Sequence, residues 1–148
     1  MILRQTLPQD LASELPRHFY RRPRQPLSRP PPSPTTPRRL SSARLRRVVD
    51  YVRGHLADNL TLVPVADVAG MTPHHFARLF KAATGMLPYR FVLLQRISRA
   101  GTLLADVNLP IGEIASAVGI DSENHFRRHF RRITGKTPEQ FRVDLLNP

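Results

Sequence analysis

Residues 75–91 read HFARLFKAATGMLPYRF, and residues 125–141 read HFRRHFRRITGKTPEQF, which is the same pattern 50 residues later. Eight of the 17 aligned positions are identical. An internal repeat at a fixed spacing indicates one structural unit that is built twice. Because the apolar residues of both copies recur at helical spacing, the repeat predicts two equivalent short basic helices.

Each copy carries signals for where its helix begins and ends. Thr72 followed by Pro73 predicts the start of the first helix, and Ser122 predicts the start of the second. Gly85 and Gly135 are placed to end these helices in the left-handed conformation. The side chains expected to face inward are Phe76, Leu79, Phe80 and Ala83 in the first copy and Phe126, Phe130 and Ile133 in the second.

A shorter helix precedes each of these two helices. In the first copy it is expected from Thr61, as its cap, to about residue 69, and Ile111, Ile114, Ala115 and Gly119 match Leu62, Val65, Ala66 and Gly70 in the second. The offset between the copies changes from 49 to 50 residues, so the second turn carries one extra residue. A helix, a turn containing glycine and a second helix form the helix-turn-helix arrangement.

The remaining periodic segments complete an all-α fold of about seven helices without strands. A first helix capped by Ser41 or Ser42 is expected to run to about residue 58, and a final helix from Pro138 to about residue 146. A linker helix of about 88–105 would span roughly 27 Å. We therefore expect a double helix-turn-helix domain at 43–148, with units at about 43–86 and about 110–146 on either side of the linker helix.

Residues 1–42 have a different composition, with nine of the 15 prolines, eight arginines and only two acidic residues. Such a proline content predicts a disordered segment with polyproline II character and no packed core. It could act as a basic arm that adds phosphate contacts, or it could be a linker or the remnant of a lost upstream domain. The prolines argue against an organelle transit peptide, which needs an amphipathic helix.

The charge of the chain favours a polyanionic partner. It has 23 basic and 11 acidic residues, a formal net charge of +12, which points to nucleic acid first and to an anionic membrane surface second. The absence of cysteine excludes disulfides and thiolate metal sites. No apolar run approaches the roughly 18 residues of a membrane span, and no secretion signal begins the chain. We therefore expect a cytoplasmic location and no membrane partner.

The second helix of a helix-turn-helix lies in the major groove of DNA, with its first residues against base edges. Two units on one rigid helix would let one chain read two successive major grooves, at an asymmetric site. The side chains that point away from the apolar stripes, and are therefore expected to bind DNA, are His74, Ala77, Arg78 and Lys81 in the first helix and Glu123, Asn124, Arg127, Arg128 and Arg131 in the second. Lys81 and Arg131 lie further along and are expected to contact phosphates.

The region from about 44 to 142 resembles the DNA-binding domain of the AraC/XylS family of bacterial transcription regulators. The resemblance is carried by DYVRGHL at 50–56, LTLVPVA at 60–66, Gly70 to Lys81, RISRAGTLL at 96–104, LPIGEIA at 109–115 and Gly119 to Phe141. It implies promoter DNA and RNA polymerase as partners and transcription activation as the function. It implies base-facing roles for His74, Ala77 and Arg78, and for Glu123, Asn124, Arg127 and Arg128.

Most members of that family also carry a sensor or dimerisation domain before this module. The 42 proline-rich residues here cannot bury enough apolar surface to form one. We therefore expect a monomer without an effector domain or a cofactor, and the chain is either a short stand-alone regulator or the C-terminal piece of a longer one.

Three alternatives remain open from the residues. His125 and His129, four residues apart, could belong to the metal site of an enzyme. However, no glutamate completes a zinc-protease pattern, and His125 repeats His75, which predicts a half-buried structural role, so we expect no enzyme. The second alternative is a sequence-independent nucleic-acid binder driven by charge, with a steep salt dependence. The third is a degenerate fragment without a function, which would fold poorly and prefer no DNA sequence.

Overall fold

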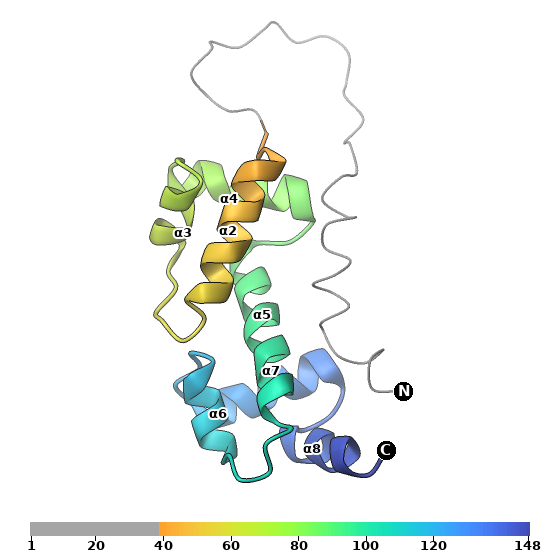
Figure 1. Cartoon of the computed structure of the whole chain (residues 1–148). Coiled ribbons are helices and arrows are strands. Elements are labelled where there is room, and N and C mark those ends of the chain that lie inside the picture. Colours follow the sequence, from red (N-terminus) through yellow and green to blue (C-terminus); the bar gives the residue numbers. More distant parts are fainter. Residues whose placement is uncertain (1–38) are drawn as a thin grey trace, which may run out of the picture.

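The computed structural model describes residues 39–148 and folds them into two helical units joined by one helix (Figure 1). These residues contain helices and no strand, which confirms the all-α prediction of about seven helices. Their bounds are α2 Ser42–Gly54, α3 Leu62–Val68, α4 Pro73–Thr84, α5 Pro88–Leu103, α6 Ile111–Ala117, α7 Glu123–Thr134 and α8 Pro138–Leu146. The arm expected at 1–42 lies almost entirely outside the described residues.

The two units have equivalent aromatic cores. In the first, the ring of Phe80 lies 5.4 Å from that of Phe76 and 5.5 Å from that of Phe91, measured between centroids. In the second, Phe130 lies 5.6 Å from Phe126 and 5.3 Å from Phe141. These six residues are the repeated phenylalanines of the sequence, and all are buried. The repeat in the sequence is therefore a repeat in the packing.

The linker helix α5 contributes to both cores, and Figure 1 shows it running from one unit to the other. Phe91 and Val92, near its start, pack into the core of the first unit. Leu93, Ile97 and Ala100 pack into the core of the second. Because burial of apolar surface is the main stabilising term in folding, α5 is held from both ends and can act as a rigid spacer between the units.

The helix starts follow the expected signals, although fewer hydroxyls act as caps than predicted. Ser41 accepts a hydrogen bond from the amide of Arg44, and Ser122 accepts one from the amide of His125. Thr61 and Thr72 occupy the N-cap positions but their side chains make no capping bond. Gly85 and Gly135 end α4 and α7 with φ of 77° and 79°, as predicted.

Two predicted helix ends are too late. The first helix ends at Gly54 rather than near residue 58, because the backbone there changes to turns, in which the amide of His55 donates to the carbonyl of Val52 and that of Asp58 to the carbonyl of His55. The carbonyls of Leu56 and Asp58, beyond the end of the helix, accept hydrogen bonds from Arg96. The linker helix ends at Leu103 rather than 105. There the carbonyl of Leu104 accepts from Arg142 Nε at 3.2 Å.

The turn between α6 and α7 carries the extra residue that the changed offset predicts. Both turns close with the same backbone hydrogen bond, from Met71 to the carbonyl of Ala66 and from Ile120 to that of Ala115. Four residues separate α3 from α4, whereas five separate α6 from α7. Within residues 39–148, no helix combines the length and apolar character that crossing a bilayer requires.

Candidate nucleic-acid interface

Helix α4 buries one face and exposes the residues predicted to bind DNA. Phe76, Leu79 and Phe80 are buried in the first core, which turns the opposite face outward. Of the predicted residues, His74, Arg78 and Lys81 are exposed and Ala77 is half-buried. The guanidinium of Arg78 lies 3.2 Å from the Nδ1 atom of His75, so His75 helps to orient it.

Helices α4 and α7 are each the second helix of their helix-turn-helix and are therefore the predicted recognition helices. Helix α7 is the more strongly basic of the two. Phe126 and Phe130 are fully buried and fix its rotation about its own axis. All five residues that the sequence assigned to DNA on this helix are exposed: Glu123, Asn124, Arg127, Arg128 and Arg131. Arg132, which the sequence analysis did not select, is also exposed and lines a shallow depression with Arg127, Arg128, Arg131 and Thr137.

Arg127 is held by two carboxylates in this structure. Its Nη2 atom lies 2.7 Å from Glu123 Oε1 on its own helix and 2.7 Å from Glu139 Oε1 on α8. The other oxygen of Glu123 lies against α6, since a Cβ added at Gly112 would be 2.7 Å from Oε2. The side chain of Glu123 therefore contacts α6 and Arg127, two contacts that its prediction as a base reader did not include.

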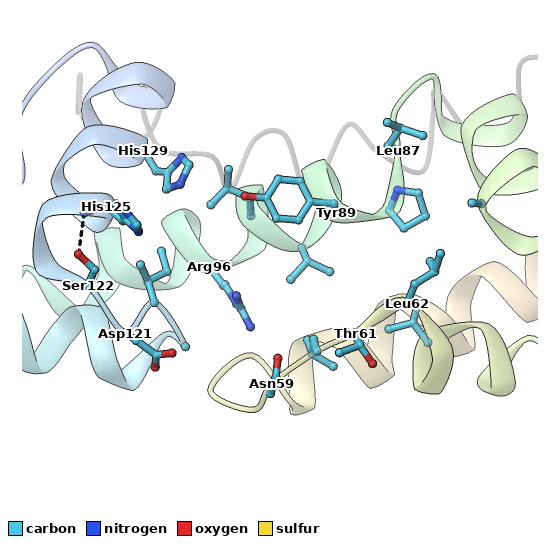
Figure 2. Close-up of a pocket in the computed structure, with 18 residues that line it drawn as sticks. Asn59, Thr61, Leu62, Leu87, Tyr89, Arg96, Asp121, Ser122, His125 and His129 are labelled. Atoms are coloured by element: carbon cyan, nitrogen blue, oxygen red, sulfur yellow. Dashed lines mark hydrogen bonds between the residues drawn. The ribbon is translucent and has the colours of Figure 1, made fainter. Parts of the chain in front are cut away.

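A groove of about 810 Å³ lies between the two recognition helices. Ala77 of α4 lines it on one side, and His125 and His129 of α7 line it on the other. Figure 2 shows Tyr89 of α5 in this groove, with its ring pointing along the helix towards His129. Tyr89 is 69% exposed, so an aromatic side chain is open to solvent on the face that the two recognition helices share.

Arg96 of α5 connects the two units at the floor of this groove. Its Nε donates to the carbonyl of Leu56 at 3.1 Å and its Nη2 to that of Asp58 at 2.9 Å, both in the loop before α3. The same Nη2 atom approaches Gly119, in the turn before α7, where an added Cβ would lie 2.9 Å from it. Burial lowers the pKa of Arg96, and the nearby charge of Asp121 opposes that effect.

The two histidines of α7 do not form a metal site with neighbouring residues. Within residues 39–148, no group of three or more His, Cys, Asp or Glu side chains could hold a metal ion. Burial, followed by the charges of Arg132, His125 and Arg128, lowers the pKa of His129 below its usual 6.5. The half-buried place predicted for both repeated histidines is correct for His75 but wrong for His125, which is exposed because it lines the open groove.

Comparison with known proteins identifies this architecture. A sequence profile described as "Helix-turn-helix domain" matches residues 65–143, which is more than half of the chain. The arabinose operon regulatory protein of Escherichia coli is 34% identical over 101 residues, covering 68% of this chain and 35% of that protein. The chain belongs to the AraC/XylS family of helix-turn-helix transcription regulators. Membership in this family assigns DNA binding to the double helix-turn-helix domain.

Two further similarities bear on function. The DNA-binding domain of AdpA, a global transcriptional factor solved in complex with a target DNA, has a TM-score of 0.63 and 31% identity, over 68% of this chain and 90% of that chain. The bifunctional transcriptional activator and DNA repair enzyme AdaA of Bacillus subtilis is 31% identical over 109 residues, covering 74% of this chain and 52% of that protein. The chain spans about a third to a half of the length of such curated relatives.

Proposed function

We propose that this protein is a site-specific regulator of transcription that reads two successive major grooves of promoter DNA, one with α4 and the other with α7. The observation that carries the proposal is the shared helix α5, which packs into the cores of both units. The 16 residues of α5 correspond to a helix length of roughly 24 Å, somewhat shorter than the roughly 27 Å estimated from the sequence. Successive major grooves on one face of the duplex lie about 34 Å apart.

The residue types on the two recognition helices support base reading. Arginine forks onto guanine, and asparagine pairs with adenine in the same groove. Arg78, Arg128 and Asn124 are exposed on faces fixed by buried phenylalanines. The first helix offers fewer such groups, because Ala77 can contact only a thymine methyl. We therefore assign the larger share of sequence discrimination to α7, with Lys81 and Arg131 as phosphate contacts.

The wider role follows the family. We propose RNA polymerase as the second partner, transcription activation as the outcome, a cytoplasmic location and a monomeric state, with no catalytic activity in residues 39–148. Support comes from the family of regulators to which the chain belongs. A promoter reporter that carries the selected site would rise with expression of the protein if it activates and fall if it represses.

A charge-driven, sequence-independent binder is the competing function, favoured by the net charge of +12. Selection from a random duplex library with the purified full chain, at about 150 mM salt to suppress charge-driven binding, separates the two. Site-specific reading would enrich one asymmetric motif with two half-elements. Recovery of an unenriched library, despite tight binding at low salt, would leave only the charge-driven function.

A further inference from the structure

The two carboxylates paired with Arg127 limit the hydrogen bonds that this arginine can donate to DNA. Both ion pairs use Nη2, with Glu123 and with Glu139 each at 2.7 Å. A bidentate contact to guanine needs two parallel N–H donors of the guanidinium. While Nη2 is paired with both carboxylates, Arg127 can offer only its other nitrogens to DNA.

Three helices build this arrangement. Glu123 begins α7, with one oxygen against Gly112 of α6 and the other on Arg127. Glu139 lies in the first turn of α8, where a carboxylate is favoured by the helix dipole. Thr137 and Gln140 form a capping box that fixes this turn. Glu139 is therefore presented by an ordered backbone, although its side chain is itself about half exposed.

We infer that Glu139 is a specificity-determining positioning residue: with Glu123 it holds the Arg127 guanidinium so that it does not bind phosphates of arbitrary sequence. Specificity is a difference between affinities, and an element that weakens wrong complexes raises it as effectively as one that strengthens the right complex. Arg127 otherwise adjoins Arg128, Arg131 and Arg132, a cluster whose attraction to any duplex would be strong. This inference rests on the proposed site-specific DNA binding.

The test measures the ratio of dissociation constants for a scrambled duplex and for the selected site, using the full chain with Glu139→Gln. Because one exposed ion pair is worth up to about 1 kcal/mol, we expect the ratio to fall about threefold to fivefold, mainly through tighter binding of the scrambled duplex. Glu113→Gln, in the first turn of α6, removes the same charge without touching Arg127 and serves as the matched control.

The decisive arm is a double-mutant cycle with Arg127→Ala, which isolates coupling between two residues. We expect Glu139→Gln to lower the ratio in the native background and to act no more strongly than Glu113→Gln once Arg127 is absent. An equal effect in both backgrounds, or an effect no larger than that of Glu113→Gln in the native protein, would overturn the inference. If the unaltered protein shows no preference for any site, the proposed function itself fails, and that result is distinct from both outcomes. Thermal melting by circular dichroism confirms that each variant is folded.

Discussion

The backbone of Gly119, in the turn of the second unit, packs directly on the carbonyl oxygen of Leu56 in the first. A Cβ placed on Gly119 would lie 2.2 Å from that oxygen and 2.9 Å from Arg96 Nη2. The same oxygen accepts the hydrogen bond from Arg96 Nε. The carbonyl of Leu56 in the first unit thus contacts both the turn of the second unit and the helix that joins the two units. These contacts fix how the two recognition helices are oriented relative to each other.

Gly119→Ala is therefore expected to be costly for two reasons. Gly119 and Gly135 have nearly the same left-handed backbone, with φ of 78° and 79°, but a Cβ on Gly135 would meet nothing within 4 Å. Gly135→Ala should lower the free energy of unfolding by about 1–2 kcal/mol through backbone strain alone. Gly119→Ala should lower it by about 1–3 kcal/mol more through the steric clash. Urea unfolding measures both, and equal losses would show that the close contact has no energetic weight.

Removal of Arg96 should loosen the spacing that the protein demands between its two half-sites. Arg96→Ala loses the bonds to the Leu56 and Asp58 carbonyls, so the first unit is held less firmly against α5. We expect the variant to discriminate less between the selected site and sites with one base pair inserted or deleted between the half-elements. Arg99→Ala, an exposed arginine on the same helix, is the control and should keep the native spacing preference. An unchanged preference in Arg96→Ala would contradict the rigid coupling of the units.

Substitutions of Arg128 and of Lys81 should weaken DNA binding in different ways. Arg128→Ala should weaken binding of the selected site by about 1–3 kcal/mol and relax the preference at one position. Lys81→Ala should weaken all duplexes alike and reduce the salt dependence of binding, as expected for a phosphate contact. Titrations against a panel of single-base variants measure this difference. Arg46→Ala, on the exposed face of α2, should leave the preferences unchanged.

His129 should make the stability of the second unit depend on pH. Its pKa is lowered below 6.5 in the folded chain, so the folded state binds its proton less readily than the unfolded chain does. The contribution of neutral His129 to the free energy of unfolding is therefore complete above about pH 6.5, and it is lost as the pH falls towards the folded pKa. We expect the free energy of unfolding to decline more steeply below pH 6.5 in the native protein than in His129→Gln. Parallel pH profiles would show that His129 contributes nothing to the decline.

Local patterns were sufficient to predict most of the fold. The buried phenylalanines recur at helical spacing, and Pro73, Pro138, Gly85 and Gly135 mark helix ends through constraints that act within a few residues. The seven helices and the extra residue in the second turn follow from such short-range signals. The ends of α2 and α5 were placed too late because the chain changes there from helical hydrogen bonds to turn bonds, from His55 to the carbonyl of Val52 and from Ala105 to that of Thr102.

The candidate site was predictable in its exposed residues but not in their partners. The spacing of Glu123 and Arg127, four residues apart on one helix, is compatible with an ion pair. Glu139, by contrast, reaches Arg127 only because α8 folds back against α7. Arg96 was assigned no role for the same reason, since its partners lie about 40 residues earlier in the chain.

Hydroxyl-radical footprinting of the selected site tests the central claim most directly, because it records which sugars the bound protein covers. If one chain reads two successive major grooves, the native protein will protect two windows about 10 base pairs apart on one face of the duplex, and Arg128→Ala will weaken protection mainly in one of them. A single protected window, or uniform protection along the whole duplex, would contradict the two-groove account.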